Sequence, residues 1–234
     1  MIIPESLGNI RILRIDSGKG NYLTPDDLQS MQGELRQAQL DSTVQAVVLT
    51  GTGQSFCAGM NLGSLDLKDS EGFANAFRML DSLLFQAFTF DKPLVIWGNG
   101  HSIGAGLLLQ STADFVVLGN ETRAKYSLPE LKIGLTLDRL MCLLLEYYLT
   151  QKRMLEWVFD GENRSVADFT DVQNTCVVAS DHALERALEI ANRLIANCAG
   201  FSRFKIQQRA GVVEQMRAAL QNHCYQVFVS LTVK

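Results

Sequence analysis

The sequence predicts an α/β protein: strands of a parallel β-sheet joined by helical crossovers, followed by a helical C-terminal part. Two observations predict this class. In the first half of the chain, short apolar runs of strand length alternate with longer stretches of helical length, and parallel strands need long crossovers of that kind. From about Arg139 onward the pattern is helical. The chain has 234 residues, 47% hydrophobic and 20% charged, which suits one domain with a sizeable core.

The elements follow in a regular order. Residues 9–16 read as a strand, because Ile10, Ile12 and Leu13 alternate with polar residues. In the helix that follows, Thr24 is a good N-cap and Pro25 fits the first helical position. The next strands are almost uniformly apolar, as buried parallel strands are. The expected strands are 9–16, 44–51, 92–100 and 114–120; the expected helices are 24–41, 71–88, 104–113, 140–159, 181–198 and 212–231.

Composition excludes several classes of protein. The net charge is −4 and Lys and Arg form no block, so we expect no nucleic-acid partner. The N-terminus lacks the basic and apolar regions of a secretory signal, and no apolar run reaches the length of a membrane span. We therefore expect a cytoplasmic protein without a membrane anchor. Its cysteines lack zinc-like spacing, so we expect reduced thiols and no metal site; they are Cys57, Cys142, Cys176, Cys198 and Cys224.

Two glycine-bearing turns follow neighbouring strands, at residues 51–65 and 98–109. Small residues at Ala58 and Gly59 let the backbone approach a ligand closely. The second turn leads into an apolar helix, whose first N–H groups are unpaired. Together the turns are able to aim two N–H donors at one oxygen, as an oxyanion hole does. Each turn taken alone also fits a purely structural role. A dinucleotide site at the second turn is disfavoured, because that turn does not follow the first strand.

Taken together, these segments resemble the crotonase (enoyl-CoA hydratase/isomerase) superfamily. "FCAGMNL" at residues 56–62 is similar to the family's "FxAGxDL", and "KPLVIWGNGHSIGAGLLLQSTADFVVLGNETRAKYSLPELKIGL" at 92–135 is similar to its longest motif. The resemblance implies a spiral core of repeated ββα units and a helical C-terminal region that makes trimer contacts. We expect a single domain over residues 1–234, with the core in 1–195 and the helical part from about 196. It also implies a homotrimer or hexamer.

The resemblance implies a coenzyme-A or acyl-carrier-protein thioester as substrate, and no cofactor beyond the coenzyme A that the substrate carries. The implied oxyanion donors are the backbone N–H groups of Met60 and Ala105. The residues implied to bind the thioester and its coenzyme A are Cys57, Ala58, Gly59, Asn61, Leu62 and Gly104. Asn61 stands where the family usually has Asp, and Asn caps a loop similarly.

One departure from the family bears on the reaction. Hydratases of this family use two glutamates to hold and activate a water molecule. Here the first position is Leu108, and the second, in the "PE" motif, is Glu130. A single glutamate at the second position resembles the isomerases, which shuttle one proton between carbons. Glu130 also reads as a surface acid with Lys132 as a weak partner. We expect catalysis, helped by an apolar surround that raises its pKa.

Asp138 is the second candidate acid. It lies eight residues after Glu130, where the family commonly has the first glycine of a glycine-rich helix start. Dienoyl-CoA isomerases carry an acid at a similar place, and a 4-chlorobenzoyl-CoA dehalogenase carries its nucleophilic Asp at the equivalent position. Because Asp138 also begins an apolar helical run, capping that helix is the alternative role, and one side chain is able to do both. His101, next to the second turn, is a further candidate for substrate contact.

Three functions stay open at this point. The first is an enoyl- or dienoyl-CoA isomerase, in which Glu130 moves a proton while the oxyanion hole holds an enolate. The second is a crotonase-like dehydratase or decarboxylase acting on carrier-protein thioesters in polyketide biosynthesis. The third is a homologue that keeps the fold and has lost catalysis, which the absence of an acid at position 108 favours slightly. Incubation with enoyl- and dienoyl-CoA separates the first from the others.

Overall fold

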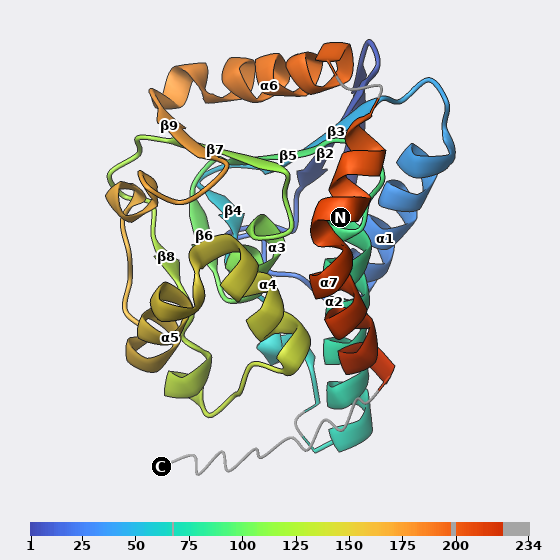
Figure 1. The fold of residues 1–234 in the computed structure, drawn as a ribbon. Coiled ribbons are helices and arrows are strands. Elements are labelled where there is room, and N and C mark those ends of the chain that lie inside the picture. Colours follow the sequence, from blue (N-terminus) through green and yellow to red (C-terminus); the bar gives the residue numbers. More distant parts are fainter. Residues whose placement is uncertain (67, 198–199, 222–234) are drawn as a thin grey trace.

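The computed structural model describes residues 1–66, 68–197 and 200–221. A large sheet runs in the order β1-β2-β3-β5-β7-β9, and a small one in the order β4-β6-β8 (Figure 1). β1 (Ile2–Leu7) pairs antiparallel with β2 (Ile10–Ile15), and every other pair is parallel. The remaining large-sheet strands are β3 (Ala46–Gly51), β5 (Leu94–Gly98), β7 (Phe115–Gly119) and β9 (Thr175–Val178); the small sheet holds β4 (Ser55–Cys57), β6 (His101–Ile103) and β8 (Tyr126–Ser127).

The chain visits the two sheets in turn, which builds the ββα repeats that the sequence resemblance implies. Each of the strands β3, β5 and β7 of the large sheet is followed by a strand of the small sheet and then by a helical segment. The helices are α1 (Pro25–Leu40), α2 (Ser70–Phe88), α3 (Ala105–Gln110), α4 (Arg139–Leu149), α5 (Gln151–Asp160), α6 (Ala183–Asn197) and α7 (Phe201–Gln221). The α/β spiral class is confirmed, and the helices expected for the first half all form.

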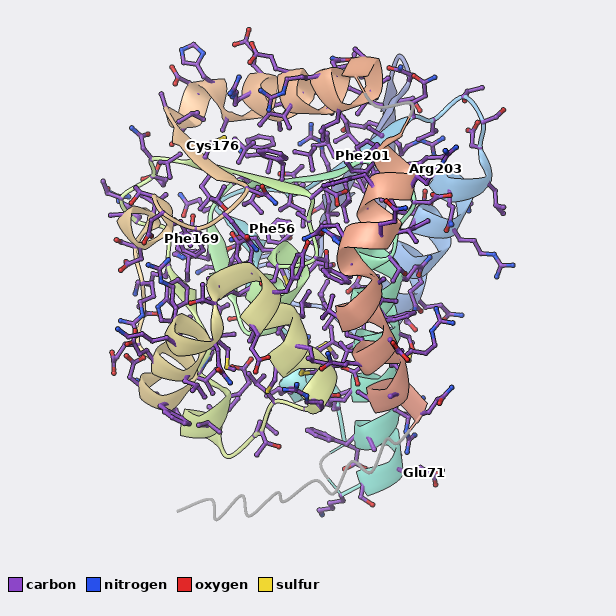
Figure 2. All side chains as sticks on the ribbon, in the orientation of Figure 1. Phe56, Glu71, Phe169, Cys176, Phe201 and Arg203 are labelled. Carbon is purple, nitrogen blue, oxygen red and sulfur yellow. The ribbon has the colours of Figure 1, made fainter. Side chains whose placement is uncertain are left out.

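The main apolar core fills the space between the large sheet, the small sheet and helices α1 to α4. Phe56 and Phe169, both fully buried, lie inside it (Figure 2). The opposite face of the large sheet is covered by α6, which packs Ala187 and Ile190 against β3, β5 and β7. α7 lies alongside α2 and also contacts α4 (Figure 1). No helix in the described part of the chain has both the length and the apolar content needed to cross a membrane.

Several local expectations need correction. The stretch after Arg139 is not helical throughout, because Thr175–Val178 forms β9 and pairs parallel with β7. The run at 140–159 is broken at Thr150, whose φ of 76° ends α4 and starts α5. β1 was not expected, since its six residues are mostly exposed and show no regular apolar alternation. The three strands of the small sheet were not expected either, since strands of two or three residues carry too little periodicity to detect. Of the helix expected at 212–231, the part up to Gln221 belongs to α7, and residues 222–231 lie outside the described residues.

Candidate active site

A cavity of about 360 Å³ opens where the small sheet ends. Because β4, β6 and β8 are parallel, their carboxyl ends meet at one edge, and the loops that leave them gather there. α2, α3 and α4 supply the other walls. The lining residues are mostly apolar or backbone: Tyr22, Ala58, Gly59, Met60, Asn61, Leu62, Gly63, Phe77, Leu80, Ile103, Gly104, Ala105, Leu108, Pro129, Glu130, Ile133, Leu135, Thr136, Leu137 and Met141.

Both predicted oxyanion donors line this cavity. Leu23 donates its N–H to Gly59 O and accepts at its own O from Asn61 N, each at 2.8 Å. Met60 lies between these two bonds, so the alternation of an extended chain turns its N–H away from Leu23. Ala105 is the first residue of α3, and its N–H therefore has no acceptor within the helix.

The two turns that carry these donors touch each other at glycine positions. Gly59 has a φ of 102°, and a side chain there would come within 3.1 Å of Ile103 O. Gly104 has a φ of 55°, which glycine adopts far more readily than other residues. The glycines therefore bring the loop of Met60 against the start of α3. This arrangement brings Met60 and Ala105 to one cavity wall, and their role as oxyanion donors stays a prediction.

Glu130 lies beside this wall. It opens the 3₁₀ turn Glu130–Ile133, and its carbonyl accepts from Leu135 N at 2.9 Å across Gly134. Its side chain points at the second turn, since a Cβ on Gly104 would lie 3.0 Å from Glu130 Oε1. The residue is only 9% exposed, and Oε2 has no hydrogen-bond partner among the described residues. Burial raises the pKa of Glu130 from its ordinary 4.5 to about 7.

Leu108 faces the same cavity one helical turn after Gly104, whose carbonyl accepts the Leu108 N–H at 3.0 Å. Its side chain is 1% exposed. Among the described residues that line the cavity, Glu130 is the one carboxylate, and none is Lys, Arg or His. The cavity thus offers one acid–base group in an apolar surround.

Asp138 is placed differently from Glu130. It caps α4: its Oδ1 accepts the N–H of Met141 at 2.8 Å. Its neighbour Leu137 and the capped Met141 line the cavity, whereas Asp138 is not among the lining residues. The capping role is therefore observed. The catalytic role predicted for Asp138 stays a prediction, and the raised pKa of Glu130 comes from burial.

The remaining predicted residues divide into two groups. Ala58, Gly59, Asn61, Leu62 and Gly104 all line the cavity, whereas Cys57 and His101 do not. The Cys57 thiol is buried behind the loop, where its Sγ accepts from Gly59 N at 3.4 Å and burial raises its pKa to about 12. It is therefore a neutral thiol that shapes the turn.

A second hollow of about 720 Å³ adjoins the first and shares Tyr22, Ala58 and Ile103 with it. His101 lies there, its Nδ1 accepting the N–H of Lys125 at 3.0 Å. Sequence reasoning missed the two exposed lysines that line it, Lys19 and Lys125. Neither lysine lies near the two glycine-bearing turns in the sequence, so the sequence offered no local signal for them. Tyr22, Phe77 and Met141 carry no motif and were missed for that reason.

Comparison with known proteins identifies the family. A family model described as enoyl-CoA hydratase/isomerase matches residues 5–231. A putative enoyl-CoA hydratase of Thermus thermophilus is 32% identical over 137 residues, a stretch that covers 57% of this chain and about half, 53%, of that protein. A short-chain-enoyl-CoA hydratase of Clostridium acetobutylicum is 25% identical over 201 residues, covering 84% of this chain and 76% of that one.

Solved structures agree on the fold. A probable enoyl-CoA hydratase of Mycobacterium tuberculosis has a TM-score of 0.86 at 22% identity, covering 94% of this chain and 93% of that one. An enoyl-CoA hydratase from Polaromonas sp. JS666 has a TM-score of 0.81 at 26% identity, covering 95% and 89%. The family model spans nearly the whole chain, and the chain therefore belongs to the enoyl-CoA hydratase/isomerase family.

Proposed function

We propose that the protein is an acyl-CoA isomerase that moves the double bond of an enoyl or dienoyl thioester. The observation that carries this proposal is Glu130, the one carboxylate among the described residues that line the cavity. Glu130 is buried, has a pKa raised to about 7, and lies beside the two proposed backbone donors. A group with a pKa near neutrality is able both to take and to return a proton, which is what an isomerase requires of one acid–base residue.

The reaction then proceeds in two proton transfers. Ionised Glu130 takes a proton from C2 of a 3-enoyl thioester, and the electron pair of that C–H bond shifts toward the thioester carbonyl. The N–H groups of Met60 and Ala105 hold the resulting enolate oxygen. Protonated Glu130 then gives the proton to C4, so that the C3=C4 double bond becomes C2=C3. The proton taken from C2 is the one returned to C4, and no water is consumed or released.

Leu108 supports isomerisation over hydration. A hydratase must hold a water molecule against the double bond, and an apolar side chain offers that water no acceptor. The relatives named above are called hydratases, so hydration is the competing function.

The same apolar wall, with Phe77, Leu80 and Met141, favours an uncharged aliphatic acyl group, because a charge buried there would have no partner among the described lining residues.

The hollow with Lys19 and Lys125 suits the other end of the substrate. Lysines at a shallow, partly polar surface attract phosphate groups, and this hollow joins the acyl cavity through Tyr22, Ala58 and Ile103. We assign it to the nucleotide and phosphates of coenzyme A. The phosphopantetheine of a carrier protein carries one phosphate and no nucleotide, so a thioester bound to such a protein would leave much of this hollow unused.

The test compares two reactions of the same protein. 3-Hexenoyl-CoA should be converted to 2-hexenoyl-CoA, whereas hydration of crotonyl-CoA should be weak or absent. Glu130→Gln should abolish the conversion while binding of hexanoyl-CoA persists. Hydration of crotonyl-CoA faster than the conversion of 3-hexenoyl-CoA would make the protein a hydratase. Thioester binding without either reaction in the wild type would make it an inactive homologue.

A further inference from the structure

One side chain of the C-terminal helix is buried against two helices that line the cavity. Arg209, on α7, is only 4% exposed. Its guanidinium donates to Phe88 O at 2.5 Å, to Ala113 O at 3.2 Å and to Thr112 O at 3.4 Å. The same group lies over the Phe88 ring, 4.1 Å from its centroid. These four contacts join a residue late in the chain to two segments about 100 residues earlier.

The carbonyls that Arg209 holds lie at the end of α2 and in the turn that follows α3. Phe88 is the last residue of α2, and Thr112 and Ala113 follow the end of α3. Carbonyls at a helix C-terminus lack intrahelical partners, and a cation at that end is favoured by the helix dipole. A planar guanidinium has several donors in fixed directions, so it is able to satisfy at once the last carbonyl of α2 and two carbonyls of the turn after α3.

A buried carboxylate fixes this guanidinium in place. Asp114 Oδ1 lies 2.9 Å from the Arg209 guanidinium, and Asp114 Oδ2 lies 2.8 Å from Lys205 Nζ. Oδ2 also accepts the N–H of Leu94, the first residue of β5, at 2.8 Å. Arg209 is therefore tied to the sheet through Asp114 as well as to both helix ends. All three charged side chains are less than 10% exposed, so water competes little for these contacts.

This cluster connects to the cavity through α3. That helix has six residues, and it begins at Ala105, whose N–H is one of the two proposed oxyanion donors. So short a helix moves as a unit, and a shift at its C-terminal end displaces its first N–H. α2, whose end Arg209 also holds, supplies Phe77 and Leu80 to the cavity wall. The position of the donor thus depends on a contact made by α7.

We infer that Arg209 is a positioning residue: through the ends of α2 and α3 it holds the Ala105 N–H where the thioester oxygen binds. The inference rests on the proposed function, because it takes the Ala105 N–H to be an oxyanion donor. Displacing a donor by a fraction of the bond length weakens its hold on the developing charge, and misplacements on the order of 1 Å cost about a hundredfold in rate. Loss of the guanidinium is therefore expected to lower kcat by about tenfold to a hundredfold.

The test uses the full chain and three variants. Arg209→Met keeps an apolar side chain without the donors, and Arg209→Lys keeps the charge with a different geometry. Lys92→Met is the matched control, because Lys92 clamps the end of α1 in the same way, donating to Ala38 O at 2.7 Å and Asp41 O at 2.8 Å. Neither Lys92 nor α1 lines the cavity. The readouts are Tm, kcat and KM for 3-hexenoyl-CoA, and the infrared carbonyl band of bound ¹³C-carbonyl butyryl-CoA.

The expected result separates kcat from KM. Arg209→Met should lower kcat by at least about tenfold and should change KM by less than about threefold. The carbonyl band should return toward its value in free butyryl-CoA. Arg209→Lys should change kcat and the carbonyl band in the same direction but by less. If Arg209→Met does not fold, the Arg209→Lys variant tests the inference instead. Lys92→Met should lower Tm alone. A Tm loss with unchanged kcat and carbonyl band in both Arg209 variants would overturn the inference.

The carbonyl band keeps this test independent of turnover. If the wild type shifts the band on binding but isomerises no thioester, the proposed function fails while loss of the shift in the Arg209 variants still supports the positioning role. If the wild type does not shift the band, Ala105 is not an oxyanion donor and the inference fails with it.

Discussion

Burial of Glu130 has a consequence for stability that is measurable without any substrate. Its pKa rises from 4.5 to about 7 on folding. Between these two values the folded protein keeps Glu130 protonated while the unfolded chain is ionised there. The folded state therefore binds more protons, so the free energy of unfolding falls as the pH rises through this window. Above about pH 7 the loss is complete, and at about 1.4 kcal/mol per pKa unit it amounts to about 3 kcal/mol.

Glu130→Gln removes this titration and leaves the shape of the side chain nearly unchanged. The free energy of unfolding of the variant minus that of the wild type should rise by about 3 kcal/mol between pH 4.5 and pH 8. Any fixed cost of burying the amide cancels, because it is present at both pH values. The carboxylates whose pKa folding lowers, Asp27 and Asp160 among them, act on both proteins alike and also cancel.

The measurement is urea unfolding at steps of half a pH unit, at one protein concentration and constant ionic strength. Glu121→Gln, at an exposed glutamate, is the control and should give a difference that does not depend on pH. A flat difference for Glu130→Gln as well would refute the reasoning. It would mean that Glu130 is ionised in the folded protein at pH 5 to 6 and is reached by water or a cation.

The other predictions concern the reaction and its specificity. Leu108→Glu should raise crotonyl-CoA hydration by at least about tenfold, since a second acid–base group contributes about 100-fold or more when well placed; Leu108→Gln, which lacks the acid, should not. Asp138→Asn should keep Tm and turnover near the wild type, because asparagine caps a helix as well as aspartate; a loss of dienoyl-CoA turnover at unchanged Tm would instead make Asp138 a second catalytic acid. Hexanoyl-CoA should bind at least about 100-fold more tightly than its ω-carboxyl analogue adipyl-CoA by calorimetry, because the buried carboxylate would have no cation among the described lining residues.

Much of the site was predictable from the sequence because its parts are local. The oxyanion donors that we propose are backbone groups in glycine-bearing turns, and a few adjacent residues determine such a turn. The pattern around Gly59 and Gly104 therefore located Met60 and Ala105 correctly beside the cavity. The "PE" motif located Glu130 and the helix after Gly104 located Leu108 for the same reason. Strands and helices of ordinary length were also predictable, because apolar periodicity within one element reports which face it buries.

The tertiary structure decided what depends on segments far apart in the sequence. The sequence predicts an apolar surround that raises the pKa of Glu130, but the burial that raises it comes from segments packed beside the turn at Gly104. Asp138 depends on both kinds of contact. Its capping bond forms within its own turn, but the cavity beside it is lined by other elements, so only the tertiary structure places Asp138 relative to the cavity. Arg209 belongs to no sequence motif. Its inferred role depends on carbonyls of two distant segments, which only folding brings next to it. Local pattern fixes which groups are available for chemistry, and long-range packing fixes their solvent exposure and their neighbours, on which their reactivity depends.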